Sequence, residues 1–187
     1  MMIRTFIAIE LPVEVKRVVR QIQDQLGGSI EGIKWVKQEN IHLSVKFLGN
    51  VEENGINDIA TAVKNAVKES SVMNLKTGHL GAFPNEKRPR ILWLGVEGDV
   101  REFISMSKNC ELELAKLGYE IDARENKPHI TIGRIRSSKK QKGVINILKD
   151  IPVESILFRV DALKLMRSEL NINGAVYTNL QSVKLEK

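Results

Sequence analysis

Hydrophobic and polar positions follow two periodicities along this chain, one typical of helices and one typical of strands. Apolar residues three or four positions apart predict amphipathic helices over 12–26, 55–69 and 99–117, and a short basic helix is expected at about 139–149. Short apolar or alternating stretches predict strands over 2–9, 32–36, 41–48, 73–82, 90–97, 119–123, 129–135, 154–166 and 174–184.

The order of these elements mixes strands and helices without strict βαβ alternation. This order predicts an α+β fold with mainly antiparallel sheets. A Glu-Asn pair occurs shortly before His42 and again shortly before His129, and the strand around each of these histidines follows a helix and a strand. We interpret this as a weak internal duplication, which predicts two pseudo-symmetric lobes facing a central cleft, with the helices outside. No Gly/Ser linker separates the halves, so a single compact bilobal domain is expected over 1–187.

A short pattern occurs twice on two of the predicted strands. Residues 41–45 and 128–132 both contain histidine, an apolar residue, a hydroxyl residue and a second apolar residue, and the chain has three histidines in total. Because successive strand side chains point to opposite faces, His42 shares a face with Ser44, and His129 shares a face with Thr131. Two such strands can bring two imidazoles and two hydroxyls to one site.

These residue types suit proton transfer around a phosphate group. Histidine has an ordinary pKa near 6.5, so one neutral imidazole can accept a proton from water while a second, protonated one donates to a leaving alkoxide. Hydroxyls can donate hydrogen bonds to phosphate oxygens. No acidic cluster or third ligating histidine accompanies the pattern. The sequence therefore predicts cleavage of a phosphodiester with no metal and no cofactor required.

The two motifs resemble those of a known family. Residues 39–49, ENIHLSVKFLG, resemble the first motif of the RNA 2′,3′-cyclic phosphodiesterases, also called the 2′-5′ RNA ligase family, within the 2H phosphoesterases. Residues 127–134, KPHITIGR, resemble the second motif. Supporting segments at 4–12, 81–84, 88–93 and 165–170 resemble the family's opening, middle and closing strands, so the resemblance covers almost the whole chain.

The resemblance implies hydrolysis of a 2′,3′-cyclic phosphate at an RNA end, tRNA fragments among the candidate substrates, to a 2′-phosphate, and the reverse joining of RNA ends through a 2′-5′ bond. By this resemblance His42 is the proton donor to the departing O3′ and His129 the proton acceptor that activates water. Ser44 and Thr131 hold the phosphate, although serine replaces the usual threonine at position 44. Arg134 matches a phosphate-contacting arginine. Simple alternation places it opposite His129, so it reaches the phosphate only if the strand twists or ends there.

Composition changes this picture in three ways. The net charge of +6 fits either simple solubility or an anionic partner such as nucleic acid, whereas an aromatic content of 5% argues against a broad stacking platform for long single strands. The single cysteine, Cys110, excludes an internal disulfide framework and a cysteine zinc cluster, and it is expected in the core. No apolar stretch is long enough for a membrane helix, and the N-terminus reads as a strand and not as a signal peptide. A cytoplasmic monomer is expected.

Alternatives remain open on the sequence alone. His79 has no partner pattern and is interpreted as structural or exposed. Phe47 falls on the apolar face of its strand and is expected in the core, with stacking on a base as the alternative. The basic residues Arg136, Lys139, Lys140 and Lys142 form either a solvated helix face or a contact to the RNA backbone. The main rival function is a non-catalytic protein that grips an RNA end or phosphate; a small cyclic nucleotide substrate and a histidine metal site are the others.

Overall fold

The computed structural model describes residues 1–187 apart from 28–29, 31, 86, 137–143, 173 and 186–187. Its helices are α1 (Val13–Gly27), α2 (Ile56–Val67), α3 (Val100–Ala115) and α4 (Val144–Asp150), with 3-10 turns at Gln38–Asn40 and Glu53–Gly55. Its strands are β1 (Met2–Glu10), β2 (Ile33–Trp35), β3 (His42–Glu52), β4 (Met73–Phe83), β5 (Ile91–Gly98), β6 (His129–Ile135), β7 (Leu157–Val160), β8 (Ala162–Asn171) and β9 (Gly174–Lys184).

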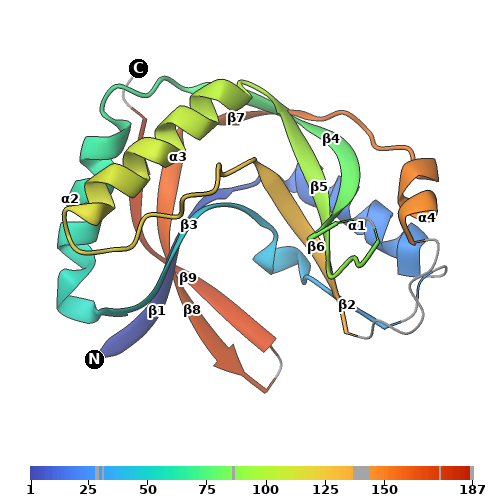
Figure 1. Ribbon diagram of the computed structural model, residues 1–187, viewed down its shortest axis with the longest axis horizontal. Coiled ribbons are helices and arrows are strands. Elements are labelled where there is room, and N and C mark those ends of the chain that lie inside the picture. Colours follow the sequence, from blue (N-terminus) through green and yellow to red (C-terminus); the bar gives the residue numbers. More distant parts are fainter. Residues whose placement is uncertain (28–29, 31, 86, 137–143, 173, 186–187) are drawn as a thin grey trace.

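All of these strands form one antiparallel sheet. The order across it is β7-β4-β5-β6-β3-β1-β8-β9, and β2 pairs with the far end of β6. The sheet curls, with α2 and α3 at one end and α1 and α4 at the other (Figure 1). The predicted α+β class with antiparallel strands is confirmed, and the two lobes are the halves of this single curled sheet. The halves meet where β3 pairs with β6, which are the two histidine strands.

The predicted helix stripes face the core. In α1 the side chains of Val15, Val19 and Ile22 are buried, as their spacing of three or four residues requires. Cys110 of α3 is also fully buried, which confirms its expected place in the core, and burial raises the pKa of its thiol to about 12.

Two of the expected strands differ from the structure. Residues 119–123 form no strand, and Ile121 is exposed. Residues 154–166 contain parts of two strands, since β7 ends at Val160, pairs with β4, and lies at the opposite edge of the sheet from β8. The buried side chains change phase at this crossing, from Phe158 and Val160 to Leu163 and Leu165, and the prediction of a single strand over 154–166 missed that break. Of the basic helix expected at 139–149, residues 139–143 lie outside the described part of the chain.

Candidate active site

The register of β3 against β6 places the two motifs side by side. Leu43 pairs with Ile130, and both side chains are fully buried on one face. Continuing this antiparallel register by one residue each way sets His42 opposite Thr131 and Ser44 opposite His129. The four polar side chains are half-buried on the other face of the sheet. Each imidazole therefore lies across from the hydroxyl of the other motif, and the structure brings all four predicted residues together.

Both histidines are held by the same backbone contact. The Nδ1 of His42 lies 2.7 Å from the carbonyl oxygen of Asn40, and the Nδ1 of His129 lies 2.8 Å from that of Lys127. A carbonyl oxygen only accepts hydrogen bonds, so Nδ1 carries a proton and donates it in each ring. The neutral form of each histidine then has its lone pair on Nε2. Each Nε2 is consequently the ring atom that can accept a proton from a substrate or donate one to it.

Arg134 lies on the same face as the histidines because β6 carries a bulge. Trp93 of β5 pairs with Thr131, but Ile91, two residues before Trp93, pairs with Arg134, three residues beyond Thr131. The extra residue at Ile132–Gly133 reverses the alternation. Regular strand alternation predicts that Arg134 lies on the face opposite His129. The bulge shifts the alternation by one residue and places Arg134 on the same face as His129.

The environment of His42 lowers its pKa below the ordinary histidine value. Burial has the largest effect, because it disfavours the charged imidazolium, and the positive charges of Arg134 and Lys16 act in the same direction. The hydrogen bond to the Asn40 carbonyl opposes them. His42 is therefore neutral at neutral pH while no anion is bound.

Replacing Arg134 with glutamine is expected to raise the pKa of His42. The substitution removes a nearby positive charge that opposes protonation, whereas burial is unchanged, so the pKa rises but stays below the ordinary value. Titration of the His42 ring by NMR measures this shift. The control is Lys34→Gln, because Lys34 pairs with Arg134 across β2 and β6 but is not among the charges that lower this pKa. An unchanged pKa in Arg134→Gln would contradict the assigned cause.

A second bulge, in β3, makes the expected core position of Phe47 wrong. Ala8 of β1 pairs with Ser44, and the preceding residue, Ile7, pairs with Lys46, so Val45 is the extra residue. Beyond it the faces are exchanged: Lys46 is 8% exposed and Phe47 is 65% exposed. The Phe47 ring contacts Phe6, with centroids 5.8 Å apart.

Lys46 and Asn126 connect the strand of the first motif to the segment that leads to the second. The Lys46 ammonium contacts the Glu111 carboxylate of α3 at 2.5 Å and donates to the Glu120 carbonyl at 2.8 Å. The Asn126 amide donates to the carbonyl of Val45, the bulged residue, at 2.7 Å. Segment 119–128 is therefore fixed to β3 by side chains, and the position of His129 depends on these bonds.

Asn40 has a role similar to that of Asn126, on the other half of the sheet. Its side-chain amide donates to the Ala175 carbonyl of β9 at 2.7 Å, while its own carbonyl accepts from His42. Sequence reasoning noted the two Glu-Asn pairs as a sign of duplication but did not assign the asparagines a role. Both asparagines hold the chain just before a histidine, and their recurrence was the signal available in the sequence.

Aromatic rings surround each histidine, which sequence reasoning missed. The ring centroids of Phe6 and Tyr177 lie 5.0 and 5.4 Å from that of His42. Those of Phe83 and Trp93 lie 4.9 and 6.5 Å from that of His129. The aromatic residues are few, as the composition states, but they are concentrated around the two histidines. Their distant positions in the chain gave no local signal.

The remaining sequence candidates lie outside this group. His79 is exposed, in agreement with a surface role, and its ring meets Trp93 edge-on at 5.4 Å. Arg136 is exposed, whereas Lys139, Lys140 and Lys142 lie outside the described residues. Within the described ranges, no three His, Cys, Asp or Glu side chains gather as metal ligands. No helix in the described part of the chain is long and apolar enough to cross a membrane.

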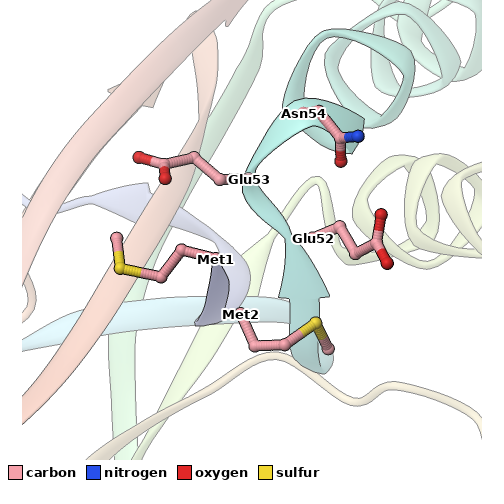
Figure 2. Close-up of a pocket in the computed structure, with 5 residues that line it drawn as sticks. All are labelled: Met1, Met2, Glu52, Glu53 and Asn54. Carbon is pink, nitrogen blue, oxygen red and sulfur yellow. The ribbon is translucent and has the colours of Figure 1, made fainter.

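Two open hollows lie elsewhere on the surface. One, of about 580 Å³, is lined by Met1, Met2, Glu52, Glu53 and Asn54, at the end of β3 far from His42 (Figure 2). Another, of about 520 Å³, lies between α2 and β9 and includes Thr61, Lys64 and Gln181. Neither contains a histidine. The two carboxylates of the first disfavour a phosphate, so the histidine face remains the candidate site.

Comparisons with known proteins identify the family of the chain. The family model described as LigT-like phosphoesterase matches residues 9–93 and 95–177, one stretch around each histidine motif. A protein of Methanothermobacter thermautotrophicus is 30% identical over 99% of this chain and 100% of its own length. A protein of Thermotoga maritima is 33% identical over 98% of this chain and 96% of its own. Both are named RNA 2′,3′-cyclic phosphodiesterase.

Solved structures show the same fold. The crystal structure of a Thermus thermophilus protein has a TM-score of 0.77 and 26% identity, covering 97% of each chain. That of E. coli LigT complexed with 3′-AMP has a TM-score of 0.77 and 21% identity, covering 100% of each chain. With a family match over nearly all of its length and these full-length relatives, the chain belongs to the LigT-like phosphoesterases, a family of hydrolytic enzymes.

Proposed function

We propose that this protein hydrolyses RNA 2′,3′-cyclic phosphate ends to 2′-phosphates, with His42 as proton donor and His129 as proton acceptor. The observation that carries the proposal is the pair of imidazoles on adjacent strands, each with Nδ1 bound to a carbonyl and Nε2 left for chemistry. The names of the full-length relatives support the substrate.

The proton transfers follow from this arrangement. The Nε2 of His129 removes a proton from water as the water oxygen bonds to phosphorus, and the Nε2 of His42 gives a proton to O3′ as the P–O3′ bond breaks. The pKa of His42 is lowered in the free protein, so His42 must take up a proton from solvent as the substrate binds. The negative charge of a bound phosphate favours the imidazolium and supplies that condition.

The phosphate is held by the side chains between the histidines. Ser44 and Thr131 each lie opposite the other motif's histidine, where their hydroxyls can donate to non-bridging phosphate oxygens. Arg134, brought to this face by the bulge, contributes a guanidinium that favours the charge developing on the phosphate oxygens. A metal ion has no required step in this scheme.

The reverse reaction uses the same groups. A 5′-hydroxyl in place of water attacks the cyclic phosphate and forms a 2′-5′ bond, which is the ligation that the resemblance implies. The same proposal includes cytoplasmic RNA as the substrate, with tRNA fragments among the candidates. It also includes activity as a monomer.

Removing either hydroxyl is expected to weaken substrate binding. Ser44→Ala and Thr131→Ala each lose a hydrogen bond to a charged group, so KM rises roughly tenfold in each. Ser44→Thr keeps the hydroxyl and adds the stiffer β-branched side chain, so its KM stays within about threefold of the original value. Steady-state hydrolysis of a cyclic-ended oligoribonucleotide measures these values. A larger loss in Ser44→Thr than in Ser44→Ala would contradict the role of the hydroxyl.

The direct test is hydrolysis of a short RNA ending in a 2′,3′-cyclic phosphate with excess EDTA. The proposal predicts turnover that EDTA does not reduce, and a product with the phosphate on O2′ by ³¹P NMR. A 3′-phosphate product would contradict the assignment of the leaving oxygen. RNA binding without turnover would instead favour the rival, a non-catalytic protein that holds RNA ends on the same face.

A further inference from the structure

The indole of Trp93 lies flat across the sheet beside His129. Trp93 of β5 pairs with Gly81 of β4, and a Cβ placed on Gly81 would come within 2.2 Å of the indole Cζ2. A Cβ on Gly95, the residue of β5 that pairs with His129, would come within 3.3 Å of the indole Cζ3. Two positions without side chains therefore give the ring room to lie against the backbone.

Other rings stand around this indole. Phe83 lies with its centroid 5.3 Å from that of Trp93, and its plane is tilted by 35°. His79 and His129 meet the indole more steeply, at 73° and 63° and at 5.4 and 6.5 Å. Trp93 is half-buried, so part of the ring remains accessible. The arrangement is a shallow aromatic platform with His129 at its border, which we call the Trp93 platform: Trp93, Phe83 and His79.

The sides of phosphorus from which one oxygen leaves and the other attacks determine which nucleoside can reach this platform. The oxygen that leaves, O3′, belongs to the terminal nucleoside of the RNA and receives its proton from His42. The attacking oxygen comes from the other side of phosphorus, where His129 removes its proton. The terminal nucleoside therefore lies toward His42, whose own aromatic neighbours are Phe6 and Tyr177. The Trp93 platform lies on the side of the attacking group.

We propose that the Trp93 platform binds the base of a second nucleoside, the one whose 5′-hydroxyl competes with water for the cyclic phosphate. This inference rests on the proposed function. Base stacking on an aromatic ring tolerates any base, because every base has a π face. The site therefore selects an attacking group that carries a base over a simple alcohol.

The step is balanced without any further reactant. The 5′-oxygen forms a bond to phosphorus, and its proton passes to the Nε2 of His129. The P–O3′ bond breaks, and O3′ receives a proton from the Nε2 of His42. The product is a 2′-5′ phosphodiester with a free 3′-hydroxyl, and exchange with solvent returns both histidines to their starting protonation states.

The test is the partition of one cyclic-ended dinucleotide between water and an added alcohol. Adenosine supplies a 5′-hydroxyl with a base, and tetrahydrofurfuryl alcohol supplies a similar hydroxymethyl ring without one. For each, the ratio of diester to 2′-phosphate is measured within the same reaction, so the overall rate of a variant does not enter. We expect the original protein to prefer adenosine by about tenfold.

Two variants change the platform, and a third variant, which leaves it intact, is the control. Trp93→Ala removes the platform, and Gly81→Ala displaces the indole, so both are expected to lose the preference for adenosine. Phe47→Ala removes an exposed ring on the His42 half and should keep it. An equal preference in the original protein and in Trp93→Ala would overturn the inference, as would an original protein that does not distinguish the two alcohols.

A binding measurement separates this inference from the proposed function. The indole N–H resonance of Trp93 is followed by NMR during titration with adenosine, and ribose serves as the reference without a base. A saturable shift with adenosine alone supports the platform even if no hydrolysis occurs, in which case only the proposed reaction fails. No difference between adenosine and ribose would overturn the platform whatever the enzyme's activity.

Discussion

Replacing His42 or His129 with alanine lowers the rate of cyclic phosphate hydrolysis by about 10²–10⁴-fold in each case, the usual contribution of a general acid or base. Each histidine is the sole proton-transferring side chain on its half of the sheet in this account, and each has its Nε2 directed away from the backbone carbonyl that binds Nδ1. The measurement is single-turnover hydrolysis of a cyclic-ended oligoribonucleotide at saturating enzyme.

Binding and folding must be controlled in the same experiment. Thr61→Ala, on the exposed surface of α2, provides the matched variant away from the site, and its rate is expected to stay close to that of the original protein. Both histidine variants should still bind the RNA, because Ser44, Thr131 and Arg134 remain. A loss of less than about tenfold in either histidine variant, with binding intact, would show that this side chain transfers no proton in the slow step.

Glu111→Ala is expected to reduce the free energy of unfolding by about 3–5 kcal/mol, the usual effect of removing one partner of a buried ion pair. The side chains of Lys46 and Glu111 are only 7% and 14% exposed, so the substitution leaves an ammonium buried without its carboxylate. Glu111 also accepts a hydrogen bond from the Asp122 backbone, which fixes the segment that leads to His129. Urea unfolding followed by circular dichroism measures the change.

Glu113→Ala is the matched control, since Glu113 pairs with Lys116 on the same helix with 67% of the lysine side chain exposed. An exposed pair contributes about 0–1 kcal/mol, so this variant should unfold almost like the original. The double variant Lys46→Met, Glu111→Leu removes both charges and is expected to recover most of the stability. If Glu111→Ala unfolds like Glu113→Ala, the buried pair does not stabilise the fold as described.

The sequence was sufficient to predict elements whose apolar residues have a regular spacing. The stripe of Val15, Val19 and Ile22 indicated α1, and the repeated histidine pattern indicated the two strands that meet at the centre of the sheet. Alternation also placed His42 with Ser44 and His129 with Thr131 correctly on one face each. These properties depend on residues near one another in the chain, which is why they could be read locally.

The errors at the candidate site occur where one extra residue changes the face of a strand. The bulge at Val45 exposes Phe47 and buries Lys46, and the bulge at Ile132–Gly133 turns Arg134 toward the histidines. A bulge is defined by pairing with a partner strand, so the sequence of one strand does not reveal it. The aromatic neighbours of the histidines were missed for the same reason, because they come from other strands.

The most direct test of the two histidine roles is to replace the leaving O3′ of the cyclic phosphate by sulfur and compare the histidine variants. A thiol ionises near pH 8.5, far more readily than an alcohol, so the sulfur leaves without needing a proton. If His42 donates the proton, His42→Ala cleaves the sulfur-containing end at a rate within about tenfold of the original protein, while His129→Ala remains slow on both substrates. The assignment of His42 as proton donor and His129 as proton acceptor would be contradicted if the sulfur substrate restored the cleavage rate of His129→Ala. It would also be contradicted if the sulfur substrate restored the rate of neither variant.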